Sequence, residues 1–221
     1  MSDQTINRQT LLELRDTQFP LLKKLRQKAP GTYIHSLLVS ELSTTAALHF
    51  KHCDPLLTQV GGMFHDIGKM VHPEAYAENQ EDGEYPFLPE VIITHVEKSI
   101  ELGKSFHLPE CVIRFMITHH GTQNAPSLNP EQKNPYPCSL RPHTIEETLI
   151  MLADSCEAAV RGNTDFSRES VKHTIKKVFS SKIKKEQLRE SVLIHSDLHQ
   201  VEEDFADVFL AVYHRRFATE N

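Results

Sequence analysis

The sequence predicts an all-α protein that folds as a single domain over residues 1–221. Apolar residues recur at helical spacing along most of the chain, and the alternation that marks strands is nearly absent. No internal repeat and no convincing linker divides the chain, and its 221 residues are enough to bury a sizeable core. The 39% hydrophobic and 24% charged residues are typical of a globular protein rather than a disordered one.

The first predicted elements are two short helices over residues 7–16 and 19–28, which form a helical extension within residues 1–30. A longer helix is predicted from Tyr33 to about Phe50, with Thr32 placed to cap it. The next helix opens with an aspartate cap followed by proline at the first helical position, and it runs over residues 54–67.

The middle of the chain alternates helices with two proline-rich segments. Residues 72–90 contain acidic clusters and three prolines and are predicted as a loop, whereas residues 90–106 are predicted as a helix. A proline opens a further helix over residues 109–120. The segment 121–143 contains five prolines. A loop of this length in a compact domain usually has a function, so we expect it to contribute to the functional site.

The last third of the chain is predicted to hold three helices. Thr144 and Glu147 have the spacing of a capping box, which opens a helix over residues 145–161, and Gly162 ends it. Two more helices follow over residues 168–182 and 197–216.

Charge and cysteine usage exclude several functional classes. The net charge of −6 gives no electrostatic support for binding a DNA or RNA duplex or an acidic membrane. The four cysteines form no Cys-x-x-Cys pair, so a reducing cytoplasm is expected rather than a disulfide framework. No apolar run approaches about 18 residues, and the polar first residues do not resemble a signal peptide. We therefore expect a cytoplasmic chain that makes no membrane contact of its own.

Polar side chains that can bind metal recur on the inner faces or at the ends of the predicted helices. Asp154 lies in an apolar, small-residue stretch, where an unpaired carboxylate would be costly to bury. The other candidates are histidines and one aspartate: His35, His65, Asp66, His95, His119 and His120.

Each candidate has an ordinary structural explanation when it is taken alone. His35 and His95 could each be a hydrogen-bonded histidine of the core. The pair at 119–120 could lie at the C-terminal end of a helix, where histidine interacts favourably with the helix dipole. Asp154 could bond a neighbouring backbone group or an arginine. Taken together, five histidines and two aspartates are a ligand set for divalent manganese, iron or zinc. Seven ligands exceed the three or four that one catalytic ion takes, so two ions bridged by Asp66 are predicted.

The order His … His-Asp … His … His-His … Asp resembles that of the HD-domain metal-dependent phosphohydrolases. Several stretches are similar to the cytosolic catalytic domain of the seven-transmembrane HD family, bacterial cyclic di-AMP phosphodiesterases. These stretches are "PGTYIHSLLVSELS", "GGMFHDIGKM", "EAYAENQ", "FMITHHGT", "LIMLADSCEAAVR" and "LIHSDLHQVEEDF". The resemblance implies a single HD-domain helical bundle with a metal site at its centre.

The resemblance also implies ligand sets, cofactors and a substrate. One ion would be held by His35, His65, Asp66 and Asp154, and the other by Asp66, His95, His119 and His120. Family members use manganese or iron and convert cyclic di-AMP to linear pApA. They tether this domain to transmembrane helices, which implies a longer protein acting at the cytosolic face of the inner membrane.

The chain departs from the family pattern in loops expected to touch the nucleotide. The family's Gly-Pro-Lys-Pro-like turn is replaced by "YPCSLRP", and the acidic segment from Glu78 to Leu88 looks shortened. The Gly-Tyr-Pro signature of cyclic di-GMP-cleaving relatives is absent after His120, where the sequence reads "GTQNAPS". These departures concern the substrate more than the metal site.

Three residues are predicted to contact the substrate. Lys69 follows Asp66 by three residues and is placed to neutralise a phosphate oxygen, although a solvated loop lysine is the alternative. Asn79 and Arg161 are weaker candidates for phosphate or base contacts. Amides at positions 79, 80, 123 and 124 could pair with an adenine edge.

The sequence is also compatible with other functions. They are an HD hydrolase of another nucleotide, such as a nucleoside phosphate or the guanosine alarmone, a metal-holding but inactive nucleotide sensor, and a plain helical interaction module.

Overall fold

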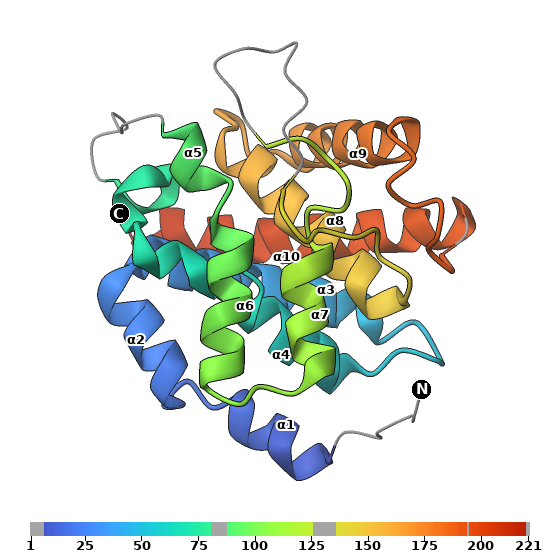
Figure 1. Cartoon of the computed structure of the whole chain (residues 1–221). Coiled ribbons are helices and arrows are strands. Elements are labelled where there is room, and N and C mark those ends of the chain that lie inside the picture. Colours follow the sequence, from blue (N-terminus) through green and yellow to red (C-terminus); the bar gives the residue numbers. More distant parts are fainter. Residues whose placement is uncertain (1–6, 81–87, 126–135, 194, 220–221) are drawn as a thin grey trace.

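The computed structural model describes residues 7–80, 88–125, 136–193 and 195–219, and within these ranges the chain forms α-helices and no strand (Figure 1). The α-helices are α1 (Arg8–Leu14), α2 (Pro20–Lys28), α3 (Pro30–Ala47), α4 (Pro55–Phe64), α5 (Pro89–Ile92), α6 (His95–Ser105), α7 (Glu110–Thr118), α8 (Ile145–Arg161), α9 (Arg168–Lys184) and α10 (His195–Thr219). Short 3₁₀ helices η1 (Ile67–Val71), η2 (Pro73–Ala75) and η3 (Ala77–Asn79) lie between α4 and α5. The predicted all-α class is confirmed.

Local chemistry sets two helix starts as predicted. Before α4, the Asp54 carboxylate accepts a hydrogen bond from the Leu56 N–H at 2.9 Å. Before α8, the Thr144 hydroxyl accepts from the Glu147 N–H at 3.2 Å. The carboxylate of Glu147 does not complete the capping box, because it accepts instead from the His143 N–H at 2.9 Å and from Arg114.

The predicted cap at Thr32 is wrong. Proline at the first helical position starts α3 at Pro30, so Thr32 already lies inside the first turn. Its N–H donates to the side-chain oxygen of Asn79 at 3.0 Å, and its hydroxyl donates to Glu78 at 3.2 Å. Thr32 therefore ties η3 to the start of α3.

The predicted helix over residues 90–106 is interrupted, so α5 and α6 are separate helices. The interruption lies at residues 93–94, within the run Val-Ile-Ile-Thr at 91–94, whose β-branched side chains lower helix propensity. The break makes His95 the first residue of α6 rather than a mid-helix residue. Residues 72–80 contain η2 and η3 instead of an irregular loop, and residues 81–87 lie outside the described part of the chain.

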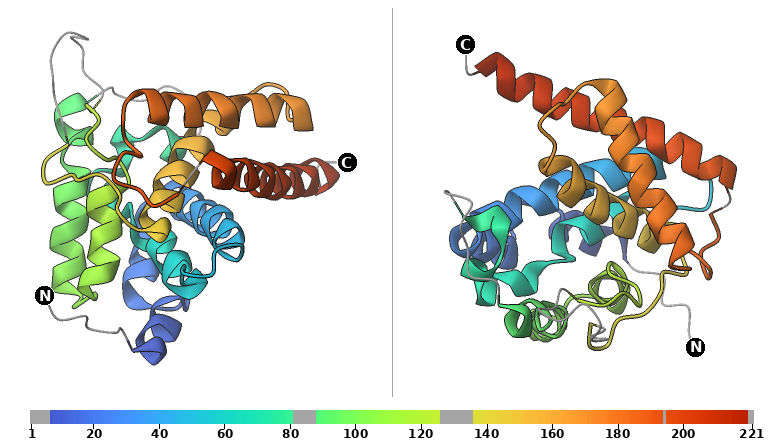
Figure 2. Two further views of the ribbon diagram at one scale, coloured as in Figure 1. Left: turned by 90° about the vertical axis from the view of Figure 1, so that its right-hand side faces the viewer. Right: turned by 90° about the horizontal axis from the view of Figure 1, so that it is seen from above.

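Two groups of apolar side chains fill the interior. One lies among α3, α8, α9 and α10 and includes Leu42, Leu149 and Phe205. The other lies among α1, α2, α4 and α7 and includes Leu21 and Phe64. On the first side, α10 packs against both α3 and α9, and the view from above shows α9 and α10 crossing (Figure 2). Among the described helices, no apolar stretch is long enough to span a membrane.

Gly62 lets the two central helices approach closely. A Cβ atom at this position would lie 2.6 Å from the Cα of Ser40, a distance that real Cβ atoms do not adopt. Glycine therefore permits direct contact between the α3 and α4 backbones, which brings His65 at the end of α4 toward His35 in α3.

Candidate metal centre

The seven predicted metal-binding side chains meet in two overlapping groups at the centre of the bundle. His35, His65, Asp66 and Asp154 form one group, and Asp66, His95, His119 and His120 form the other. Within each group the potential ligand atoms lie within 4.8 Å of one another, and no further group of this kind occurs among the described residues. The residues come from α3, the α4–η1 junction, the start of α6, the end of α7 and the middle of α8.

Asp66 stands between the two groups and presents one carboxylate oxygen to each. Its Oδ2 lies 3.3 Å from Nε2 of His65 and 3.5 Å from Nε2 of His35. Its Oδ1 lies 3.4 Å from Nε2 of both His95 and His119. This is the arrangement that a carboxylate needs to bridge two cations.

In four of the histidines, a hydrogen-bond acceptor lies close to Nδ1, the ring nitrogen that faces away from the centre. Nδ1 of His35 lies 2.5 Å from the Glu157 carboxylate, and Nδ1 of His65 lies 2.8 Å from the Gly62 carbonyl. Nδ1 of His95 and of His119 lie 2.6 Å and 3.0 Å from the carbonyls of Ile92 and Met116. Because every partner is an acceptor, Nδ1 carries the hydrogen when the ring is neutral, and the Nε2 lone pair then faces the centre.

Buried acceptor atoms at the centre lack donors. Nε2 of His35 and of His65 and Oδ1 of Asp66 are buried and have no hydrogen-bond partner in the described residues. Nε2 of His95 lies 3.4 Å from Nε2 of His119 and 3.0 Å from Nε2 of His120. Two imidazole lone pairs repel at such distances unless a proton or cation lies between them. The neutral imidazoles and carboxylates therefore fit a divalent metal.

The pKa values of the site differ sharply between its two sides. Burial by itself lowers the pKa of a histidine, yet the charge of Asp66 and the nearby carboxylate of Asp154 raise the pKa of His65 to about 9. The pKa of His95 falls to about 4, because burial outweighs the attraction of Asp66. Burial also opposes the charge on Asp66, but Lys69 and His65 hold the pKa of this carboxyl well below its usual range. Asp66 therefore keeps its negative charge.

Lys69 lies beside the bridging carboxylate. Its Nζ is 2.7 Å from Oδ2 of Asp66 and 3.0 Å from the Glu78 carboxylate, and it lies over the Tyr76 ring. Burial alone would lower the pKa of Lys69, but the charges of Asp66 and Glu78 raise it. The side chain is 13% exposed and lines a cavity of about 510 Å³, so its cation is available to a ligand.

This cavity opens directly on the metal-binding side chains, because His120 and Asp154 form part of its wall. Tyr136 also lines it, with its ring stacked on His120 at a centroid distance of 4.1 Å and an interplanar angle of 13°. Gln123 and Asn124 belong to the wall as well. The proline-rich segment 121–143 thus supplies one side of the cavity, although residues 126–135 lie outside the described part.

Asn79 and Arg161 do not line this cavity. The amide of Asn79 donates to the Thr32 hydroxyl at 2.9 Å and accepts from the Thr32 N–H. The guanidinium of Arg161 lies 3.1 Å from Glu157 and 3.8 Å from Glu78. Arg161 therefore holds Glu157, which lies against His35, whereas Asn79 holds Thr32 at the start of α3. A substrate contact by either residue stays a prediction.

Gly68 allows η1 and α6 to pack closely together. A Cβ atom there would lie 2.1 Å from the His95 carbonyl oxygen and 2.5 Å from the Ser99 N atom. The Gly68 N–H donates to the Ser99 hydroxyl at 2.8 Å. Glycine thus lets the segment that carries Asp66 pack against the helix that carries His95.

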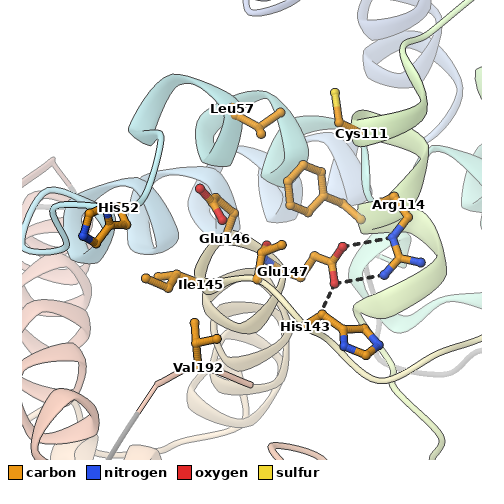
Figure 3. A pocket seen from close by; sticks show the side chains of 11 residues that line it. His52, Leu57, Cys111, Arg114, His143, Ile145, Glu146, Glu147 and Val192 are labelled. Carbon is orange, nitrogen blue, oxygen red and sulfur yellow. Dashed lines mark hydrogen bonds and ion pairs between the residues drawn. The ribbon is translucent and has the colours of Figure 1, made fainter. Parts of the chain in front are cut away.

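A second cavity, of about 670 Å³, lies between α4, α7 and the start of α8 (Figure 3). Its charged groups are already paired. The Glu147 carboxylate accepts from Arg114 at 3.0 and 3.3 Å, as Figure 3 shows, and Glu146 accepts from the Asp54 N–H at 2.8 Å. None of the residues around it belongs to the metal-binding groups, so this cavity is separate from the candidate metal centre.

Sequence reasoning missed three residues that shape the site. Glu157 lies three residues after Asp154 on the same face of α8, and this spacing was the available signal. Tyr136 lies in the segment 121–143, which the sequence predicts to contribute to the site without assigning a role to this residue, and Lys182 lines the cavity from a segment that no motif singles out.

Comparison with known proteins gives a consistent picture. A model of the HD domain family matches residues 32–159. The cyclic-di-AMP phosphodiesterase PgpH of Listeria monocytogenes is 32% identical over 222 residues, which cover 93% of this chain and 31% of that protein. PgpH of Bacillus subtilis is 29% identical, with 93% of this chain and 31% of that protein covered. The chain therefore spans about a third of the length of these relatives.

A solved structure matches in three dimensions. The HD domain of L. monocytogenes PgpH in complex with cyclic-di-AMP has a TM-score of 0.81 and 30% sequence identity. The match covers 90% of this chain and 100% of that domain.

Proposed function

The chain belongs to the HD domain family, and on this premise we propose that it is a metal-dependent phosphodiesterase that hydrolyses cyclic di-AMP to linear pApA. The observation that carries the proposal is the position of Asp66, with one carboxylate oxygen toward each group of histidines. The similarity to a domain solved with cyclic-di-AMP, at 30% identity over 90% of the chain, supports the substrate class.

The donor atoms support two divalent ions, manganese or iron, with zinc also compatible. One would be held by His35, His65, Asp66 and Asp154, and the other by Asp66, His95, His119 and His120. Bound together, such ions supply a nucleophile near neutral pH and Lewis acidity for the attacking and leaving oxygens.

The chain's own residues position the reacting groups. Lys69 would bind a non-bridging phosphate oxygen beside Asp66, where its ammonium offsets the negative charge that develops during attack on phosphorus. Hydrolysis adds water to one phosphorus and breaks its bond to the 3′ oxygen. The products are a 5′-phosphate and a free 3′-hydroxyl. Asp66 and Lys69 are therefore the proposed catalytic residues.

Adenine selection would come from the cavity wall. A site that adds only apolar contacts discriminates by about 10–200-fold, whereas hydrogen bonds to a base edge can discriminate further. Gln123 and Asn124 line the cavity and offer amide donors and acceptors suited to adenine. Asn79 and Arg161, which the sequence predicts as substrate contacts, would act from their positions around Glu78.

The relatives are about three times as long as this chain, which supports a tethered domain in a longer protein at the cytosolic face of the membrane. No contact with a DNA or RNA duplex is proposed, in line with the net charge of −6.

The test is an assay of the purified protein, loaded with manganese, against cyclic di-AMP, cyclic di-GMP and mononucleotides, with elemental analysis of the same samples. We expect close to two ions per chain and faster cleavage of cyclic di-AMP than of cyclic di-GMP. Equal rates on the two dinucleotides, or activity on mononucleotides only, would contradict the substrate. Absence of metal after loading would remove the whole proposal.

A further inference from the structure

One face of α9 forms a wall of the cavity that opens on the metal centre. Lys177, Val178, Ser181 and Lys182 all line this cavity. Their spacing of one, four and five residues places them together on one side of the helix. Across the cavity, α8 presents Ser155 and Ala158, whose small side chains leave the space open.

Lys182 is buried in this wall, and its ammonium group has no ion-pair partner within the described part of the chain. The residue is 5% exposed, and no hydrogen bond or ion pair joins its side chain to any described residue. Two other lysines of the same helix are paired: Lys172 contacts Glu203, and Lys176 lies 3.5 Å from Glu202. A largely buried ammonium without a direct ion-pair contact is costly, so its retention needs an explanation.

The surroundings of Lys182 point to an anionic ligand. Burial lowers the pKa of Lys182 to about 8, while the charge of Asp154 opposes this effect. The side chain is therefore largely cationic at pH 7. Lys177 adds a second ammonium to the wall, and it too has no ion-pair partner among the residues that the structure describes. Ser181, one turn after Lys177, adds a hydroxyl between the two lysines.

We propose that Lys182, assisted by Lys177, binds the phosphate of the dinucleotide that is not being cleaved. This assignment rests on the proposed function and extends it to a second phosphate subsite. A cyclic dinucleotide carries two phosphates, and this cavity carries one lysine beside Asp66 and two more on α9. Lys69 serves the phosphate under attack, so Lys182 is free to hold the other, where burial strengthens a charge-assisted hydrogen bond.

The subsite explains how the site could favour dinucleotides over substrates with one phosphate. A phosphodiester such as bis(p-nitrophenyl) phosphate presents a single anionic group, so it cannot occupy the Lys69 and Lys182 positions at once. A cyclic dinucleotide can, and the second contact adds binding energy remote from the reacting phosphorus.

The test compares the two substrate types in Lys182→Met, which keeps the length of the side chain and removes its charge. We expect the ratio of kcat/KM for cyclic di-AMP to that for bis(p-nitrophenyl) phosphate to fall on the order of 10–100-fold, mainly through KM for the dinucleotide. The matched control is Lys184→Met, which removes an exposed cation two residues further along α9 and away from this cavity. The control should keep the wild-type ratio.

The outcomes separate this inference from the function on which it rests. If the wild-type protein cleaves cyclic di-AMP and Lys182→Met keeps the wild-type ratio, the second subsite is wrong and the phosphodiesterase stands. The second subsite is equally wrong if Lys182→Met and Lys184→Met lower the ratio by the same factor, because net charge alone would then explain the effect. If the wild-type protein cleaves no cyclic dinucleotide, both proposals fail. Metal content and thermal unfolding of each variant check that the centre and the fold are retained.

Discussion

Nδ1 of His35 lies 2.5 Å from the Glu157 carboxylate, although the two residues are 122 positions apart in the chain. Glu157 is almost fully buried, and its carboxylate also lies 3.1 Å from Arg161. The pKa of Glu157 is lowered, because its contacts with His35 and Arg161 outweigh the effect of burial. A charged carboxylate behind an imidazole fixes the ring and makes its other nitrogen a stronger donor to metal.

Removing the charge of Glu157 should weaken metal binding without removing a ligand. In Glu157→Gln, we expect the affinity of the metal-free protein for manganese to fall by about 10–100-fold. Titration calorimetry measures this change. The control is Glu169→Gln at an exposed position in the first turn of α9, which should bind manganese like the wild-type protein. Equal affinities for Glu157→Gln and the wild type would show that the His35–Glu157 contact has no influence on the metal.

Substitutions of Asp66 and of Lys69 should have different effects on metal content and turnover. Asp66→Ala removes an oxygen from both groups of ligands, so we expect loss of both ions and of turnover. Lys69→Ala leaves every potential ligand in place, so the metal should be retained while kcat falls by about 10²–10³-fold. Elemental analysis and steady-state assays on the same samples check both results. Full hydrolytic activity in Asp66→Ala would exclude it as the bridging ligand.

The affinity for metal should rise with pH. In the metal-free protein the pKa of His65 is raised to about 9, so below this pH its ring carries a proton that a metal must displace. Raising the pH from 6.5 toward 9 removes this competition. The apparent affinity for manganese should increase by up to about tenfold per pH unit for each proton released. Calorimetry in buffers of different ionisation enthalpy counts these protons. An affinity that stays constant between pH 6.5 and 8.5 would contradict the assignment.

A methyl group at Gly68 should disturb both stability and the metal centre. Because a Cβ there would meet the His95 carbonyl at 2.1 Å, Gly68→Ala must push η1 away from α6. We expect a loss of about 1–3 kcal/mol in the free energy of unfolding.

Gly162→Ala is the control for this substitution. Its Cβ would meet no atom closer than 3.5 Å, and its φ is −81°, so its stability should stay within about 0.5 kcal/mol of the wild type. Thermal unfolding of the metal-free proteins compares the two variants. Equal stability of both would show that the η1–α6 contact is not tight in solution.

The helices and the ligand order could be predicted from the sequence because their signals are local. An aspartate before proline starts α4, and Thr144 caps α8, through hydrogen bonds that span two or three residues. The cap at Thr32 failed for the opposite reason. Its N–H and hydroxyl are taken by Asn79 and Glu78, which lie 46 or 47 residues away and approach only after the chain has folded.

The same limit applies to the site. His65 and Asp66 are adjacent in the sequence, so their pairing can be read directly. Glu157 and Lys182 have no such neighbour, because their roles depend on the packing of α8 against α3 and α9. The position of His95 at the start of α6 depends on a break that helical periodicity does not reveal.

The distance along the chain between His35 and Glu157 also bears on the order of events during folding. Contacts between residues far apart in sequence form late, because closing a long loop costs conformational entropy before the contact contributes favourable free energy. The His35–Glu157 contact forms only when α8 has docked on α3, which brings together residues that are more than 100 positions apart. Metal added at the start of refolding would therefore leave the early steps unchanged. Uptake at the group of His35, His65, Asp66 and Asp154, which alone includes a residue of α8, would report the moment at which α8 docks on α3.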